Sequence, residues 1–202
     1  MKLFYSPTSP YARKCRVVAL EKGLVEGRDI FIVPASPMTD PADLHAANPL
    51  GKVPALALPD GRCIVDSPVI CEFLDAASET RRLIPADPAA RIDCRTREAL
   101  ADGISDAAFS RTMERLRPET QRSPDWNRRW TSAIRRTVAW FNASIPDRPQ
   151  PDLGDIALAS ALSYVDFRHA DMHWDAEAPA LRAWLTGILA RPSLANTAPP
   201  PA

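Results

Sequence analysis

The strongest constraint on the fold is a strand-to-helix turn near the start of the chain. An apolar run ends at Tyr5, prolines at Pro7 and Pro10 interrupt it, and apolar residues then recur at helical spacing. Proline is well tolerated as the first residue of a helix, because its missing N–H would have no partner within the helix there. The sequence therefore predicts a helix over residues 10–22 with Ser9 as its N-cap.

The position of Ser9 has a chemical consequence. A helix N-terminus presents unpaired backbone N–H groups at the positive end of the helix dipole, where a thiolate, phosphate or carboxylate is stabilised. Helix capping alone also accounts for a serine at this position. The rest of the chain must therefore decide whether Ser9 belongs to an anion-binding site.

The composition argues against several classes of partner. The 202 residues include 25 Lys and Arg and 25 Asp and Glu, so the net charge is zero and gives no general attraction to nucleic acids or anionic lipids. No apolar run approaches the roughly 20 residues that a membrane-spanning helix needs. We therefore expect a cytoplasmic protein with no nucleic-acid partner and no membrane partner.

Cysteines and histidines predict neither disulfides nor a metal site. The four cysteines lie far apart without a C-x-x-C pair, so we expect reduced thiols, with Cys15 buried on the apolar side of the first helix. His169 and His173 are one helical turn apart, but no cysteine or carboxylate motif completes a set of metal ligands. We therefore expect no metal.

The segment after the first helix predicts a small mixed sheet. Residues 28–33 (R-D-I-F-I-V) predict a second strand, so that strand, helix and strand form a βαβ unit. A short helix over residues 42–47 follows. Residues 55–58 and 63–65, joined by an Asp-Gly turn, predict an antiparallel hairpin.

Two prolines of this segment bear on binding. Val53-Pro54 opens the third strand and is a candidate cis bond. A cis bond would leave the backbone N–H and C=O of Val53 facing outward, where an extended peptide could pair with them. The alternative is an ordinary entry into the strand. Asp66-Ser67-Pro68 repeats the opening pattern. We expect Ser67 to cap a helix that begins at Pro68, with Asp66 just outside it.

Three motifs in this half of the chain resemble those of a known family. Residues 9–12 (S-P-Y-A) resemble the C-P-Y-C of glutaredoxins with both cysteines replaced, and residues 48–56 (N-P-L-G-K-V-P-A-L) and Asp66-Ser67 complete the set. With its element order, the segment resembles the thioredoxin-like N-terminal domain of glutathione S-transferases. Residues 98–107 (E-A-L-A-D-G-I-S-D-A) resemble a bacterial, serine-type subgroup of that superfamily.

The second half of the chain is predicted to be helical throughout. Strand signals end at the P-A-D-P linker, and a long helix over residues 89–117 follows, in which Gly103 is expected to mark a bend or a close packing contact. The next helix begins at Ser123 or Pro124. Its expected core stripe consists of Trp126, Trp130, Ile134, Val138 and Phe141. Asp152 and Asp155 predict a capping box at a later helix, where two carboxylates would repel each other.

The resemblance implies an α/β plus all-α fold of the cytosolic glutathione transferase type. We expect a thioredoxin-like glutathione-binding domain over residues 1–78, a linker over residues 79–87 and an all-helical bundle over residues 88–202. A homodimer is also implied by the resemblance.

The resemblance also assigns expected roles in binding the tripeptide glutathione. Asp66 and Ser67 would bind the γ-glutamyl end, Val53 would pair with the cysteinyl backbone, and Lys52 would reach the glycyl carboxylate. Ser9 would donate its hydroxyl proton to the sulfur. Tyr11 belongs to the same expected glutathione-binding set.

The expected activity is conjugation of the glutathione thiolate to a small electrophile, typical of detoxification. Ser9 is the expected catalytic residue; Ser6 is its rival, and Tyr5 and Tyr11 are weaker candidates for activating the thiol. Because Ser9 and Ala12 replace both cysteines of the redox motif, dithiol chemistry is disfavoured.

The electrophile pocket is expected on the long helix, from Asp106 and Phe109, with Asp102 and Ser105 also on offer. The alternative function is a non-catalytic glutathione-binding or regulatory protein that uses the fold for contacts with a partner, because a fold does not determine a function.

Overall fold

A four-stranded mixed sheet forms the first half of the molecule. The computed structural model describes residues 1–39, 41–145 and 148–200. The sheet has the strand order β2-β1-β3-β4, in which β1 (Lys2–Tyr5) is parallel to β2 (Phe31–Pro34) and antiparallel to β3 (Ala55–Ala57), and β3 is antiparallel to β4 (Cys63–Ile64). This arrangement contains the predicted βαβ unit and hairpin.

The second strand begins three residues later than residues 28–33 predict. A turn occupies the start of that run: the amides of Arg28 and Asp29 donate to the carbonyl of Val25, and the Asp29 carboxylate accepts from the Val25 amide at 2.8 Å. Those backbone groups are therefore used within the turn, and regular pairing with β1 starts at Phe31.

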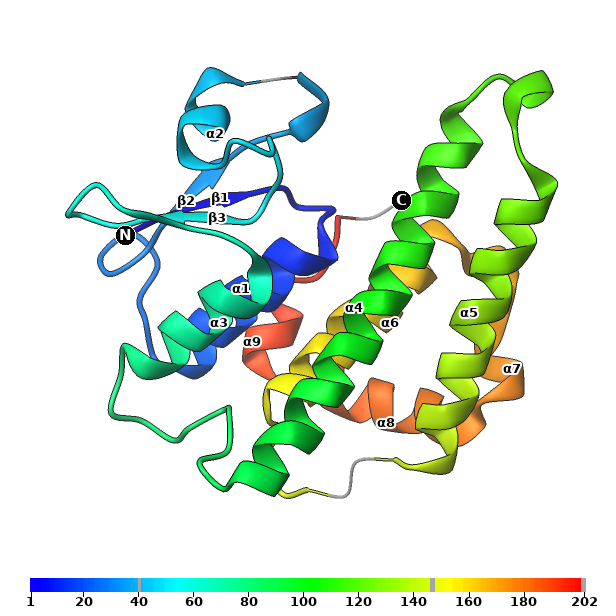
Figure 1. Ribbon diagram of the computed structural model, residues 1–202. Helices are drawn as coiled ribbons and strands as arrows, with labels where there is room; N and C mark the ends of the chain where they lie inside the picture. Colours follow the sequence, from blue (N-terminus) through cyan, green and yellow to red (C-terminus); the bar gives the residue numbers. More distant parts are fainter. Residues whose placement is uncertain (40, 146–147, 201–202) are drawn as a thin grey trace.

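Helices cover both faces of the sheet (Figure 1). On one face lie α1 (Pro10–Glu21) and α3 (Ser67–Ala76), and on the other lies α2 (Ala42–Ala47), at the bounds that the sequence predicts for this short helix. Alternate residues of β1 serve the two faces, since Leu3 joins the main core with Val17 and Val18, whereas Phe4 packs with Leu44.

The second half of the chain is helical, as predicted. Its α-helices are α4 (Pro88–Leu116), α5 (Pro124–Ala143), α6 (Leu153–Arg168), α7 (Trp174–Glu177), α8 (Pro179–Leu189) and α9 (Pro192–Ala195). Short 3-10 helices are η1 (Pro37–Thr39), η2 (Glu119–Gln121) and η3 (Ala170–Met172). Helix α6 is buried on all sides from Leu153 to Val165 and is the centre of the bundle. Among the described residues, no helix is both long and apolar enough to cross a membrane.

The predicted apolar stripe of α5 is wrong at its N-terminal end. Ile134, Val138 and Phe141 are buried, but Trp126 is 53% exposed and stacks on Trp130 with ring centroids 5.7 Å apart. The first turns of α5 run beside the C-terminal end of α4 and project beyond the rest of the bundle (Figure 1), which leaves Trp126 exposed, whereas Trp130 packs at the edge of the main core.

The close contact expected at Gly103 is also absent from the part of the chain that the structure describes. A β-carbon placed on Gly103 would meet no atom within 4 Å. This glycine therefore does not serve a tight packing contact. Gly154 does: its β-carbon would lie 2.8 Å from the carbonyl oxygen of Cys94.

The capping box at the start of α6 forms as predicted. The amide of Asp155 donates to the Asp152 carboxylate, and the amide of Asp152 donates to the Asp155 carboxylate, each at 3.1 Å. Arg97 of α4 donates to both carboxylates, and Arg148 lies 3.2 Å from Asp155. The expected repulsion is thus offset by cations that the sequence pattern did not identify.

Candidate functional site

The first part of the site is the turn that ends at Ser9. The side-chain oxygen of Ser9 accepts a hydrogen bond from the amide of Ala12 at 3.2 Å, so Ser9 is the N-cap of α1 as predicted. This bond uses a lone pair of the hydroxyl and leaves its proton. Within the described chain, Ser9 Oγ–H meets no acceptor. The hydroxyl can therefore donate to a group bound at the start of α1.

The other hydroxyl and thiol groups nearby are already engaged. Ser6 Oγ lies 3.3 Å from Thr8 Oγ1, and the Ser6 carbonyl accepts from the Ser9 amide. Cys15 is fully buried, and burial, with the Cys71 thiol 3.7 Å away, raises the pKa of Cys15 well above its ordinary value. Cys15 is therefore an unreactive core thiol, as expected.

The second part of the site is the start of α3, a helix that packs beside α1 (Figure 1). The prediction that Ser67 caps this helix is wrong, because Asp66 is the N-cap and Ser67 is the first helical residue. Asp66 has an extended backbone, and its Oδ1 accepts from the amide of Ser67 at 2.5 Å. The helix consequently begins one residue earlier, which places Pro68 in its first turn.

Ser67 is unusual within this helix start. The residue is 1% exposed, and its Oγ has no hydrogen-bond partner in the described structure. Buried hydroxyls are generally paired, because leaving one unpaired costs about 1–3 kcal/mol. An unpaired buried hydroxyl at a helix N-terminus is therefore a feature that a bound anion would satisfy.

The loop before β3 presents an unpaired stretch of backbone. The Val53-Pro54 bond is cis, and the N–H and C=O of Val53 form no hydrogen bond with the described residues. Buried Asn48 holds this loop, since its side-chain amide donates to the Lys52 carbonyl at 2.8 Å and its oxygen accepts from the Leu50 amide at 3.0 Å. Lys52 itself is exposed on the loop.

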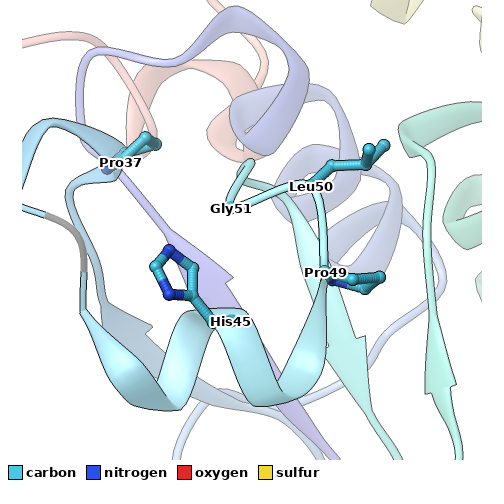
Figure 2. A pocket seen from close by; sticks show the side chains of 5 residues that line it. All are labelled: Pro37, His45, Pro49, Leu50 and Gly51. Carbon is cyan, nitrogen blue, oxygen red and sulfur yellow. The ribbon is translucent and has the colours of Figure 1, made fainter.

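A pocket of about 600 Å³ lies beside this loop, lined by Pro37, His45, Pro49, Leu50 and Gly51 (Figure 2). The imidazole of His45 rises from α2 toward Gly51 and Pro37. A β-carbon on Gly51, whose φ is +62°, would lie 3.1 Å from His45 Nε2. No sequence motif marks His45, although the loop that carries Gly51 follows α2 directly in the chain.

The residues expected to form the electrophile wall, Asp106 and Phe109, lie on α4, and Asp106 contacts α1 through Tyr11. Tyr11 donates its phenol proton to Asp106, and burial, followed by this hydrogen bond, raises the pKa of Tyr11 above its ordinary value. Tyr11 therefore stays protonated and cannot act as a base. Phe109 is 45% exposed, one helical turn after Asp106.

Two other candidates for this wall are engaged elsewhere. Ser105 is buried, and its hydroxyl donates to the carbonyl of Ala101 at 3.3 Å within α4. Asp102 accepts from the ammonium of Lys14, at 2.7 and 2.8 Å. The expectation that Ser105 is on offer to an electrophile is therefore wrong. In the described part of the chain, no group of three or more His, Cys, Asp and Glu side chains is placed to hold a metal ion.

Comparisons with known proteins agree on the family. The model of the glutathione S-transferase N-terminal domain matches residues 8–77, and that of the C-terminal domain matches residues 124–187. The chain is 34% identical over 206 residues to the uncharacterized GST-like protein YibF of Escherichia coli K12, with all of both chains covered.

Two solved structures are similar over nearly the whole chain. A glutathione transferase family member from Pseudomonas fluorescens Pf-5, with bound glutathione, has a TM-score of 0.94 and 38% identity, with 98% of each chain covered. A glutathione S-transferase from Methylobacillus flagellatus, also with glutathione bound, has a TM-score of 0.92 and 38% identity, covering 98% of this chain and 99% of that one. This chain belongs to the glutathione S-transferase family.

Proposed function

We propose that the protein binds glutathione along the first turns of α1 and α3 and adds its thiolate to a small electrophile. The observation that carries this proposal is the pair of hydroxyls at the two helix starts: among the described residues, the Ser9 proton has no acceptor and the buried Ser67 hydroxyl has no partner. Both hydroxyls are explained by one bound anionic ligand. Two relatives with 38% identity hold glutathione, which supports this ligand.

Each end of glutathione has a proposed partner. The Ser67 hydroxyl and the N-terminus of α3 bind the γ-glutamyl carboxylate, and the free oxygen of Asp66 accepts from its ammonium. The unpaired backbone of Val53 pairs with the cysteinyl residue. Lys52 binds the glycyl carboxylate beside the pocket that His45 lines.

Ser9 is the proposed activator of the thiol. A hydrogen bond to a charged group contributes roughly 1.5–3 kcal/mol, and about 1.36 kcal/mol corresponds to one pKa unit, so Ser9 lowers the pKa of the glutathione thiol by about one to two units. The N-terminus of α1 adds to this effect. Tyr11 contributes contact rather than activation, since its phenol proton is donated to Asp106. The scheme needs neither a general base nor a metal.

The electrophile is proposed to lie between the two halves of the molecule, against Asp106 and Phe109.

We also propose a division into a glutathione-binding domain over residues 1–78, a linker over residues 79–87 and a helical domain over residues 88–202. A homodimer in the cytoplasm with a role in detoxification remains part of this proposal, supported by the family alone.

Calorimetric titration of glutathione into the wild type and Asp66→Ala tests the binding step. We expect binding by the wild type and a loss of affinity of at least about tenfold in Asp66→Ala, because one charge-assisted hydrogen bond is removed. Asp60→Ala is the matched control, since Asp60 is an exposed acid on the neighbouring hairpin that pairs with Arg62. Equal affinity in all three proteins would contradict the proposed site.

Ultraviolet absorbance of the bound thiolate across pH then tests activation. A thiol pKa below that of free glutathione supports the role of Ser9, and turnover of chlorodinitrobenzene supports conjugation. Binding without turnover over a broad electrophile panel would instead favour the alternative function, a non-catalytic glutathione-binding or regulatory protein.

A further inference from the structure

Three acidic residues of α4 point at the helix that carries Ser9. Glu98, Asp102 and Asp106 are spaced by four, so they lie on one face of α4. Glu98 and Asp102 both accept from Lys14 of α1, and Asp106 accepts from Tyr11 of α1. In the described structure, all side-chain hydrogen bonds between α1 and α4 come from these contacts.

The contact made by Lys14 is deeply buried. The Lys14 side chain is 1% exposed, and its ammonium lies 3.0 Å from Glu98 and 2.7 Å from Asp102, whose side chains are 3% and 21% exposed. A buried lysine is costly unless it is paired, so this geometry is strongly preferred over any arrangement that separates α1 from α4. Lys14 is too enclosed to touch a ligand.

We propose that Lys14, through Asp102 and Glu98, is a positioning residue that holds the first turns of α1, and with them Ser9 and Tyr11, at a fixed distance from the electrophile wall of α4. The role rests on the proposed function. It assigns a task to the acidic motif at residues 98–107, which glutathione binding leaves unused.

The charges around Asp102 make this contact sensitive to pH. On α1, Asp102 faces Lys14 and Tyr11. On its own helix it faces Glu98 and Asp106. Cys71 of α3 lies near Lys14, and Tyr164 of α6 lies near Tyr11. Arg95 pairs with Oε2 of Glu98 at 2.9 Å, the oxygen that Lys14 does not contact. Burial raises the pKa of Asp102 to about 6, against the attraction of Lys14. Below this pH, the contact loses its carboxylate while Lys14 keeps Glu98.

The test compares the affinities of two probes by calorimetry, glutathione and S-hexylglutathione. The ratio of the two affinities isolates the contribution of the hexyl group, which in the proposed arrangement lies against Asp106 and Phe109 of α4. The variants are Lys14→Met and Asp102→Asn, singly and together. Glu21→Gln is the matched control, since Glu21 pairs the other end of α1 with Arg191 at 2.9 Å, also across the two halves of the molecule.

We expect both single variants to lower the S-hexylglutathione to glutathione affinity ratio by about tenfold, or about 1.4 kcal/mol, with glutathione affinity itself within about twofold. The double variant should lose no more than either single one, because the pair acts as a unit. Lowering the pH from about 7.5 to about 5.5 should reduce the wild-type ratio but leave that of Asp102→Asn unchanged.

Four outcomes would overturn the proposal. An effect in Asp102→Asn without one in Lys14→Met would mean that Asp102 touches the electrophile directly, and an effect of Glu21→Gln as large as that of Lys14→Met would mean general loosening. A wild type that binds neither probe would overturn the proposed function together with this role. If the wild type and the single variants bind both probes with the same affinity ratio, this role alone is overturned. If Lys14→Met does not fold, the pH comparison with Asp102→Asn decides, because that variant keeps the Lys14–Glu98 pair.

Discussion

The amide of Ala12 donates to the hydroxyl oxygen of Ser9 at 3.2 Å, so one side chain caps α1 and still has a proton to give. Structural and proposed catalytic roles therefore share one atom. A substitution that removes the hydroxyl will affect stability and turnover together, and these effects must be measured separately.

We predict that Ser9→Ala lowers chlorodinitrobenzene turnover at neutral pH by about tenfold, because the bound thiol loses about one pKa unit of activation. Glutathione affinity should be largely retained. The free energy of unfolding should also fall by about 1 kcal/mol through loss of the cap. Steady-state kinetics, calorimetry and urea unfolding measure the three quantities. As controls, Ser9→Thr should keep most of the activity and Ser6→Ala should behave as the wild type. Unchanged turnover in Ser9→Ala would rule out Ser9 as the activator of the thiol.

Ser67 should serve the ligand rather than the fold. We predict that Ser67→Ala leaves the unliganded protein as stable as the wild type, or up to about 1 kcal/mol more stable, because an unpaired buried hydroxyl is removed. Glutathione affinity should fall by about tenfold. Ser163→Ala is the control: its buried hydroxyl donates to the Ala159 carbonyl at 2.7 Å, so stability should fall there while binding is unchanged. A loss of stability in Ser67→Ala as large as that of the control would contradict the prediction.

Two helical glycines should respond in opposite directions to alanine. In Gly154→Ala the new methyl group would lie 2.8 Å from the Cys94 carbonyl and 3.0 Å from the Arg97 β-carbon, so we predict a loss of about 1–3 kcal/mol. In Gly103→Ala the methyl group meets nothing within 4 Å, and we predict a gain of about 0.5–1 kcal/mol from helix propensity. Urea unfolding distinguishes them, and a destabilised Gly103→Ala would reveal a contact that the described residues lack.

Asp102 should make the stability depend on pH in a direction opposite to most carboxylates. Its pKa is raised from 3.8 to about 6 in the folded protein by burial, so between these values the folded state binds a proton that the unfolded state does not. This contribution to stability is complete below about pH 4 and is lost as the pH rises through 6, by roughly 3 kcal/mol at most. The unfolding free energy of the wild type should therefore fall relative to that of Asp102→Asn as the pH rises from about 4 to about 6. A constant difference would show that Asp102 is ionised throughout.

Most of the fold could be predicted because its signals are local. Ser9-Pro10 and the Asp152 and Asp155 box mark helix starts through bonds within four residues, and the structure contains both. Two of the errors lie where two local solutions compete. At residues 28–33 a carboxylate-stabilised turn replaces the start of the strand, and at α3 the extended Asp66 caps in place of Ser67.

The sequence by itself determined the family, the order of the elements and the hydroxyls and backbone groups proposed to hold glutathione, since each depends on short motifs. Only the tertiary structure decided which partners the buried charges have: Lys14 meets Asp102 across 88 residues, Tyr11 meets Asp106 across 95, and Arg97 meets Asp152 across 55. It likewise left Trp126 exposed at the projecting end of α5. Charge attraction and burial act through space, and no spacing along a chain shows which distant helix faces will meet.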